Sequence, residues 1–499
     1  MSIPIYNVQQ IREWDKFTIK NEPIASIDLM ERAAHQCVDY LLKQYKGLKS
    51  VNIFAGIGNN GGDGLVIARA LHFCNVKVHL FIVEFSKEYS DDFNKNLKML
   101  GGNVIPTYIN KKHLISEIPY AELNIDAIFG SGLNREIETG WLSDLIQLIN
   151  QSSIKTIAVD LPSGLFGFDN RKNTLKNIIK ADETLTFQLP KLPFFFERYE
   201  NFIGHYQVIE IGLHSNYKEQ TPYYIAEIGD VELKTFSKFA HKGTKGHLLL
   251  VGGFDKMYGA VTLATKSAYK IGCGYVMVKM ETEGNVVLLN HILEAVIIDD
   301  VEAIKNKLKA IGIGVGLGQS KNSLKMLKQI LSFNLPTVID ADALNLLSKH
   351  KELINFIPKN AILTPHKKEL ERLVGTYQSD EEFLDKQIEF STQHQVYIIQ
   401  KGAYSKLTCP NGDVLINSTG NNSMAVAGMG DILTGVISSL LAQGYSPKQS
   451  AQFGMLLHGK AGDLMRIENG EFGNLPSDLI EYLPKIMNDI KKNNNLKND

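Results

Sequence analysis

The sequence of 499 residues predicts an α/β protein with two domains, each a mainly parallel sheet with helices on both faces. Short apolar segments alternate with helix-compatible segments along most of the chain. A polar stretch without apolar periodicity, residues 214–222, divides this alternation into two series, and we interpret it as a linker. The length is also too great for one hydrophobic core.

Composition narrows the class of protein. Hydrophobic residues make up 44% and charged residues 21% of the chain, as in ordinary globular proteins. The formal net charge of −1 gives no general attraction to nucleic acid or to an anionic membrane. Cys37, Cys74, Cys273 and Cys409 are scattered, which indicates free thiols in a reducing compartment. Without a signal-like N-terminus or an apolar run of roughly 18 residues, we expect a cytoplasmic protein.

The first series opens with two helical segments, residues 8–20 and 28–42. Six strand candidates follow, with helical segments between several of them: 51–55, 76–83, 123–129, 156–161, 183–188 and 207–211. Strands that alternate with helices are typical of a parallel sheet. We expect this first domain to span residues 1–213.

The second series begins near Tyr223. Its strand candidates are 247–251, 275–280, 310–313, 337–339, 361–363 and 396–400, followed by a hairpin that turns at Asn411-Gly412. Helices close this domain from Gly430 to about residue 490, so we expect it to span 223–490. The polar tail 491–499 is predicted to be disordered.

A glycine-rich loop follows the first strand and precedes a helical segment. Residues 56–64 read GIGNNGGDG, and the first six match G-x-G-x-x-G, the dinucleotide fingerprint. Asp63, however, would bring a carboxylate to the positive end of the helix, where it competes with phosphate. Asn59, Asn60 and Asp63 together favour a site that also holds a cation or a sugar.

Two further segments place polar groups where strands end, at the usual ligand edge of an open α/β sheet. Asp126 leads into a glycine loop, residues 130–136, and Asp160 is followed by Leu-Pro-Ser163-Gly. Each piece alone is compatible with a turn or a helix cap, but together they favour a functional site. Glu84 ends the strand after the glycine loop, which keeps a conventional NAD site open.

These motifs, together with Leu29-Met-Glu-Arg-Ala-Ala34, make the first half similar to the NAD(P)H-hydrate epimerase domain. The resemblance implies a Rossmann-like three-layer sandwich that binds a hydrated nicotinamide nucleotide without hydride transfer. It implies a potassium ion at Asn60, Asp126 and Ser163. It implies that the hydrate contacts Asn59, Asn60, Gly61, Gly62, Asp63, Gly130, Ser131, Gly132, Leu133, Asn134, Arg135, Glu136 and Asp160. Asp160 is our candidate for handling the nicotinamide ring.

In the second half, residues 427–431 read AGMGD and an apolar helical segment follows. Gly428 and Gly430 allow backbone N–H groups to converge at a helix N-terminus, which forms an anion hole for a transferring phosphoryl group. Asp431 lies beside it, where a carboxylate can take a proton from an attacking hydroxyl. An N-cap aspartate after a flexible loop is the simpler alternative. No P-loop pattern is present in the sequence.

The second half resembles the ribokinase-like superfamily and, within it, the ADP- or ATP-dependent NAD(P)H-hydrate dehydratases. The matching motifs are His241-Lys-Gly, Gly259-Ala260, Gly314-Val-Gly-Leu-Gly, Asp340-Ala-Asp-Ala-Leu, Thr364-Pro-His, Lys401-Gly-Ala and Ala427-Gly-Met-Gly-Asp. The resemblance implies a ribokinase-like α/β domain in which Ala260, Gly316, His366 and Asp431 face the hydrate. It implies contact with ADP by Lys401, Gly402, Ala403, Tyr404, Ser405, Gly428 and Gly430. Mg²⁺ is expected to bridge the nucleotide phosphates.

We therefore expect a bifunctional metabolite-repair enzyme. The first domain would epimerise the R and S hydrates of NADH and NADPH, and the second would dehydrate the S form with conversion of ADP to AMP and phosphate. The expected partners are these small molecules, without nucleic acid or membrane, in a homo-oligomer. Three alternatives stay open: a ribokinase-type kinase fused to a nucleotide-sensing domain, a first half that serves only for interaction, and a conventional NAD dehydrogenase.

Overall fold

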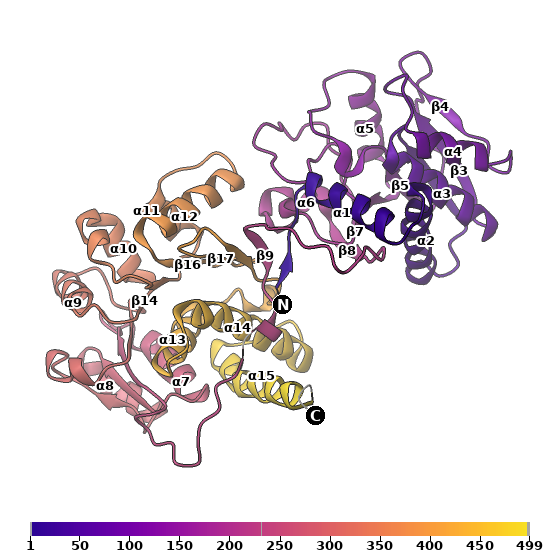
Figure 1. Cartoon of the computed structure of the whole chain (residues 1–499). Coiled ribbons are helices and arrows are strands. Elements are labelled where there is room, and N and C mark those ends of the chain that lie inside the picture. Colours follow the sequence, from indigo (N-terminus) through magenta and orange to yellow (C-terminus); the bar gives the residue numbers. More distant parts are fainter. Residues whose placement is uncertain (1, 231, 497–499) are drawn as a thin grey trace. The chain divides into compact units, whose positions relative to one another are not determined.

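The computed structural model describes residues 2–230 and 232–496, without the side chains of 493–496. The chain forms two compact units, Pro4–Thr221 and Met1–Ile3 with Pro222–Asp499. They are called the N-terminal and the C-terminal unit below. Both units are α/β structures, as the sequence predicts (Figure 1).

The N-terminal unit contains a seven-stranded sheet with the order β4-β3-β2-β5-β6-β7-β8. Every neighbouring pair is parallel. The strands are β2 (Ser50–Ala55), β3 (Lys77–Val83), β4 (Thr107–Ile109), β5 (Leu123–Ala127), β6 (Lys155–Val159), β7 (Glu183–Phe187) and β8 (His205–Ile209). The order reverses between β2 and β5, and ligands of open α/β sheets bind at such a switch point.

Helices cover both faces of this sheet: α1 (Val8–Asn21), α2 (Ser26–Gln44), α3 (Asn59–Phe73), α4 (Asp91–Met99), α5 (Trp141–Gln151) and α6 (Glu200–Ile203). Successive side chains of β2 point to opposite faces, as strand geometry requires. Ile53 and Ala55 pack in a core with α2 and α3, whereas Phe54 packs in another core with α5. The three layers expected from the sequence are therefore confirmed.

Helix α3 begins earlier than the sequence suggests. The segment Asn59–Gly64, expected as a loop, forms the first turns of α3. The helix begins here because its glycines allow a very close approach: a Cβ on Gly61 would lie 1.9 Å from the Gly56 carbonyl oxygen. A Cβ on Gly64 would lie 2.8 Å from that of Ala127 on β5. The start of α3 is thus fixed directly at the carboxyl end of β2.

The C-terminal unit contains an eleven-stranded sheet with the order β1-β9-β18-β17-β16-β15-β14-β13-β10-β11-β12. The strands from β12 to β16 are all parallel, and β16, β17 and β18 form the expected antiparallel hairpin region. The strands are β1 (Ile3–Pro4), β9 (Tyr223–Ile225), β10 (His247–Val251), β11 (Tyr275–Lys279), β12 (Val296–Ile297), β13 (Ala310–Ile313), β14 (Thr337–Ile339), β15 (Ile362–Leu363), β16 (Tyr397–Gln400), β17 (Lys406–Thr408) and β18 (Val414–Ile416).

Two helical layers enclose this sheet as well. Leu248 and Leu250 of β10 pack with α7, α13 and α14, while Leu249 and Val251 pack with α9 and α10. The helices are α7 (Tyr258–Lys270), α8 (Asn285–His291), α9 (Lys321–Ser332), α10 (Ala341–Lys349), α11 (Lys367–Val374), α12 (Asp380–His394), α13 (Met429–Ala442), α14 (Pro447–Asn469) and α15 (Pro476–Leu496). The strand order reverses between β10 and β13, which places a second switch point here.

Two segments differ from their expected character. Helix α15 continues through 491–496, so this part of the predicted disordered tail is helical, and 497–499 lie outside the described residues. Residues 214–221 of the expected linker belong to the N-terminal unit, where Tyr217 stacks on Trp14 of α1 with ring centroids 5.5 Å apart. In the described part of the chain, no helix is long and apolar enough to cross a membrane.

Candidate functional site

A cavity of about 910 Å³ opens at the carboxyl ends of β2, β5, β6 and β7 in the N-terminal unit. Helix α1 contributes Arg12 and Asp15 to its lining. Ten of the predicted substrate-binding residues line it: Asn59, Asn60, Asp63, Ser131, Gly132, Leu133, Asn134, Arg135, Glu136 and Asp160. The other three, Gly61, Gly62 and Gly130, have no room for a Cβ. They allow the backbone segments around the cavity to approach one another.

The loop after β5 is fixed by three successive backbone N–H groups. The Phe129 N–H donates to Ser163 Oγ and the Ser131 N–H donates to Asp160 Oδ2, each at 3.0 Å. With its amide oxygen turned toward the loop, Asn60 accepts from the Gly130 N–H at 3.0 Å. Because these acceptors come from α3 and from the segment after β6, the structure unites the segments that the sequence analysis selected separately.

Asp160 is held in a buried ion pair with Lys191. The Lys191 Nζ lies 2.7 Å from Asp160 Oδ1 and also donates to Thr186 Oγ1 at 2.8 Å. Burial raises the pKa of Asp160, but the charge and hydrogen bond of Lys191 and the Ser131 N–H outweigh burial and lower it below its ordinary value. Asp160 also has a left-handed backbone, with φ of 66°. This carboxylate is therefore ionised and rigidly placed.

Two other carboxyl groups of the cavity, those of Asp63 and Asp15, have the opposite tendency. Burial, followed by the charges of Asp160 and Asp15, raises the pKa of Asp63 well above its ordinary value. Burial and the charge of Asp160 raise the pKa of Asp15 to about 6, against the lowering effect of Lys191 and Arg12. The cavity thus combines an ionised carboxylate with carboxyl groups that hold a proton more strongly, as acid–base chemistry requires.

Of the three predicted potassium ligands, Asn60 lines the cavity, whereas Asp126 and Ser163 do not. Asp126 and Ser163 are fully buried, and Asp126 Oδ1 accepts from Ser163 Oγ at 2.6 Å. Burial raises the pKa of Asp126 to about 6, although Ser163 and Ile128 donate hydrogen bonds to it. The Asn60 amide also reaches the Val159 carbonyl oxygen, at 3.3 Å. Among the described residues, no three His, Cys, Asp or Glu side chains form a metal-binding group. The donors here are instead an amide, a hydroxyl, a carbonyl and one carboxylate.

Glu84 does not occupy the position of a ribose-binding acid. Its carboxylate accepts hydrogen bonds from Tyr89 Oη and, at 2.8 Å, from Asn110 Nδ2. It is absent from the residues that line the cavity. The structure therefore does not support the conventional NAD site that Glu84 left open in the sequence.

In the C-terminal unit, the candidate site surrounds the first turn of α13. Gly428 is the N-cap residue, with φ of 104°, a conformation that glycine adopts without strain. Asp431 lies in the first turn. Burial and then the charge of Asp340 raise the pKa of Asp431 to about 7, while Lys401 acts to lower it. A carboxylate with this pKa beside a helix N-terminus can accept a proton near neutral pH.

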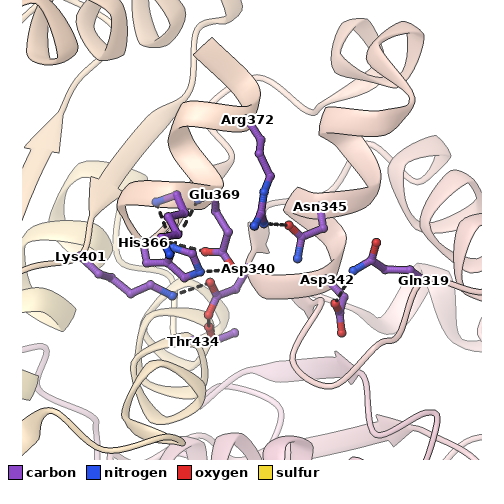
Figure 2. Close-up of polar contacts among 10 residues, drawn as sticks. Gln319, Asp340, Asp342, Asn345, His366, Glu369, Arg372, Lys401 and Thr434 are labelled. Atoms are coloured by element: carbon purple, nitrogen blue, oxygen red, sulfur yellow. Dashed lines mark hydrogen bonds and ion pairs between the residues drawn. The ribbon is translucent and has the colours of Figure 1, made fainter. Parts of the chain in front are cut away.

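Lys401 and Asp340 form a second ion pair at the carboxyl ends of β16 and β14. The Lys401 Nζ lies 2.8 Å from Asp340 Oδ1, and Asp340 Oδ2 accepts from Thr434 Oγ1 at 2.7 Å (Figure 2). A Cβ on Gly430 would lie 3.2 Å from the same Nζ. The ammonium of Lys401 is therefore close to the turn where an anion would bind.

The remaining predicted residues border this turn. His366 pairs with Lys401 in a short parallel bridge, and its Nδ1 accepts from the Lys368 N–H at 3.1 Å, so it caps α11 (Figure 2). A Cβ on Gly316 would lie 3.2 Å from that of Ala260 on α7. Residues Gly402, Ala403, Tyr404 and Ser405 form the turn that leads from β16 to β17, with Ser405 Oγ donating to the Gly402 carbonyl at 3.2 Å.

Three residues of these sites were missed by the sequence analysis: Lys191, Asp15 and Thr434. Lys191 follows the end of β7, so the strand-end rule could have selected it. Thr434 comes three positions after Asp431 on one helix, a spacing that places both on one face. Neither a strand end nor a helical spacing from a predicted site residue marks Asp15, because it lies on α1, which precedes the strands of this sheet in the sequence.

Known proteins are similar to this chain over nearly its whole length. Residues 248–485 match the family described as NAD(P)H-hydrate dehydratase, and 26–192 match the YjeF-related protein N-terminus. The bifunctional NAD(P)H-hydrate repair enzyme Nnr of Moorella thermoacetica is 31% identical over 97% of this chain and 96% of its own. That of Coxiella burnetii is 29% identical over 97% and 99%. A structure of the ADP/ATP-dependent NAD(P)H-hydrate dehydratase from Bacillus subtilis, co-crystallised with ATP and Mg²⁺, covers 53% of this chain and 96% of its own, at 27% identity and a TM-score of 0.47.

Asp63→Asn is expected to stabilise the N-terminal unit at pH 8. The folded-state pKa of Asp63 is raised, so the wild-type carboxyl group destabilises the folded unit at high pH, and this penalty decreases as the pH falls toward the ordinary value. We expect the midpoint of thermal unfolding to rise by several degrees, since ~1 kcal/mol corresponds to roughly 2–4 °C at this size.

The gain should shrink when the measurement is repeated at pH 5. Asp39→Asn, a change at an exposed carboxylate on α2, is the matched control and should leave the midpoint nearly unchanged at both pH values. A lower midpoint for Asp63→Asn at pH 8 would contradict the electrostatic interpretation of this cavity.

Proposed function

This chain belongs to the family of bifunctional NAD(P)H-hydrate repair enzymes, and we propose that it carries out both activities of that name. The N-terminal unit interconverts the R and S hydrates of NADH and NADPH. The C-terminal unit dehydrates the S form while it converts ADP to AMP and phosphate. The observation that carries the second activity is Asp431, a carboxylate with a pKa of about 7 in the first turn of α13, with the Lys401 ammonium beside that turn.

The dehydration needs a better leaving group than hydroxide. In this proposal the C6 hydroxyl of the hydrate attacks the terminal phosphorus of ADP, Asp431 takes the hydroxyl proton, and AMP leaves. The C6–O bond of the phosphorylated hydrate then breaks, phosphate departs with the bonding pair, and loss of the C5 proton restores the double bond. The N–H groups of Gly428–Gly430 and the Lys401 ammonium stabilise the charge on the transferring group.

Mg²⁺ would be held by the phosphates of the bound nucleotide and would neutralise part of their charge. We assign it no protein ligand. The turn 401–405 follows the carboxyl end of β16, and its residues Gly402 and Ala403 are exposed, so a nucleotide can reach it from solvent. The nucleotide would therefore enter over this turn, with its phosphates directed toward α13.

Epimerisation in the N-terminal unit inverts C6, so the C6–O bond must break with a proton supplied to the departing hydroxyl, and water must add to the other face of C6 and give a proton to a base. The cavity offers Asp160, ionised and fixed by Lys191, and Asp63, which holds a proton more strongly. We propose that Asp160 contacts the nicotinamide ring as the catalytic carboxylate. The loop 131–136 and the start of α3 would then bind the rest of the hydrate.

The N-terminal unit is also proposed to bind K⁺ through Asn60, Asp126 and Ser163. The fit rests on the donor set, because buried oxygens of an amide, a carboxylate and a hydroxyl suit a hard cation. We also propose the cytoplasmic location and the homo-oligomeric state that the sequence leads us to expect. Sedimentation of the purified chain tests the oligomeric state.

Asp431→Asn is expected to abolish dehydration and to leave epimerisation intact. The substitution keeps the size of the side chain but removes the base, which should lower the dehydration rate roughly 10²- to 10⁴-fold. Recovery of reduced-nicotinamide absorbance from the pure S hydrate with ADP measures the first activity. Conversion of pure R hydrate to a mixture, followed by chromatography, measures the second and shows that the chain is folded. Loss of both activities would overturn the assignment of one reaction to each unit.

Potassium is expected to stabilise the N-terminal unit relative to lithium at the same ionic strength. An ion that binds only the folded state raises the midpoint of thermal unfolding. Asp126→Asn should abolish the difference between the two salts, whereas Asp39→Asn, at an exposed carboxylate, should preserve it. Equal wild-type midpoints in KCl and LiCl would show that the proposed donor set does not bind this ion.

A further inference from the structure

Asp340 lies at the centre of the C-terminal site, although it is not among the residues proposed above to contact the substrate or the nucleotide. It lies directly after β14 and is only 1% exposed. Both oxygens of its carboxylate are used: Oδ1 accepts from Lys401 Nζ at 2.8 Å, and Oδ2 accepts from Thr434 Oγ1 at 2.7 Å (Figure 2). One carboxylate thus connects β14, the end of β16 and helix α13.

The first connection fixes the position of a cation. The Lys401 side chain is 22% exposed, so its ammonium has access to solvent and would otherwise move freely. The ion pair instead holds it beside Gly430, where a Cβ would lie 3.2 Å from the Lys401 Nζ and 3.9 Å from Asp340 Oδ2. Gly430 belongs to the first turn of α13, where the transferring phosphoryl group is proposed to bind.

The second connection reaches the helix that carries the proposed base. Thr434 is buried and lies one turn after Asp431 on α13, so the two side chains share one face of the helix. By accepting from Thr434, Asp340 is held on the side of α13 where Asp431 also lies. The charge of Asp340 therefore acts on the carboxyl group of Asp431, which is half-buried.

The charged groups around Asp431 act in opposite directions. After burial, the charge of Asp340 is the largest influence that raises the pKa of Asp431, Lys401 lowers it, and Asp342 on α10 raises it. His458 approaches the start of α13 from α14, but burial lowers its pKa to about 4, so it is neutral at pH 7. In the described residues, Asp340 is therefore the main charge that favours proton uptake by Asp431.

We propose that Asp340 is a positioning residue of the dehydratase site, which holds the Lys401 ammonium over the phosphate-binding turn and makes Asp431 a stronger base. This inference rests on the proposed function of the C-terminal unit. It assigns Asp340 no contact with the substrate. The role is electrostatic and geometric, and the two parts can be separated by different substitutions.

The first test is Asp340→Asn in the full-length protein, measured as the pH dependence of kcat/KM for dehydration of the S hydrate with ADP. The amide keeps the shape and can still accept from Lys401, but the negative charge is lost. The acidic limb, which we expect near pH 7 in the wild-type enzyme, should move to lower pH because Asp431 loses the charge that favours its protonation. We expect kcat/KM on the plateau to fall roughly 10- to 100-fold, since a charge-assisted hydrogen bond and base strength are both reduced.

Lys401→Met provides the reciprocal test. It removes the group that lowers the proton affinity of Asp431, so the acidic limb should move to higher pH, with a raised KM for ADP. Thr434→Val is the matched control, because it removes a hydrogen bond and leaves the charge of Asp340 in place. It should lower kcat/KM less than tenfold without moving the limb, and Thr434→Ser should restore the rate.

Epimerisation by the same chain shows in each case that the protein is intact. The inference would be overturned if the acidic limb of the kcat/KM profile lay at the same pH in Asp340→Asn as in the wild type. It would also be overturned if Thr434→Val shifted this limb as far as Asp340→Asn does. Either result would leave the dehydration activity itself established. If Asp340→Asn does not fold, Lys401→Met provides the test instead. An acidic limb of its kcat/KM profile at the wild-type pH would overturn the inference. A wild-type protein without nucleotide-dependent dehydration would instead refute the proposed function, and this inference with it.

Discussion

A buried carboxylate paired with a lysine lies at the carboxyl end of the parallel sheet in each unit. Asp160 and Lys191 are 2.7 Å apart in the N-terminal unit, and Asp340 and Lys401 are 2.8 Å apart in the C-terminal unit. A single buried charge costs several kcal/mol, and in each unit the charge of the lysine offsets part of that cost. The other polar groups of each site are arranged around that pair.

The paired carboxylate determines how its neighbours hold protons. In the N-terminal unit, the charge of Asp160 acts on Asp63 and Asp15 and raises the pKa of both. In the C-terminal unit, the charge of Asp340 does the same to Asp431. In the N-terminal unit the pKa values of Asp160 and Asp63 move apart in this way, so one group can stay ionised while the other holds a proton more strongly. The same electrostatic principle therefore supports two different proposed reactions.

The sequence predicted most of the architecture because parallel strands are nearly continuous apolar runs, which single-chain patterns detect well. The segments 51–55 and 247–251, for instance, are strands β2 and β10 with little change in their bounds. The start of α3 was predicted too late, since its first turns carry three glycines that local propensity assigns to a loop. Tertiary packing makes those glycines favourable in the helix: Gly64 lies against β2 and β5, Gly61 against Gly56, and Gly62 against the Met30 side chain of α2.

The sites were predicted to the extent that their residues follow strands. Asp160, Asp340 and Lys401 follow strands, and Asp126 is the last residue but one of β5, so each lies at the carboxyl end of its sheet. The partners of these residues were harder to predict. Thr434 looks like an ordinary helical residue until Asp340 is placed beside it, and Asp15 reaches the cavity only because α1 folds over an edge of the sheet that is built later in the chain. Such contacts depend on the tertiary arrangement and leave no local pattern.

The central claim is that one chain restores both epimers of a damaged cofactor. The most direct test is recovery of reduced-nicotinamide absorbance from a mixture of R and S NADH hydrate, with K⁺ and Mg²⁺, in the presence of ADP, of ATP or of no nucleotide. Complete recovery that requires a nucleotide is the expected result. Recovery that stops at the S fraction would contradict the epimerase activity, and accumulation of a phosphorylated product without recovery would replace the dehydratase with a kinase.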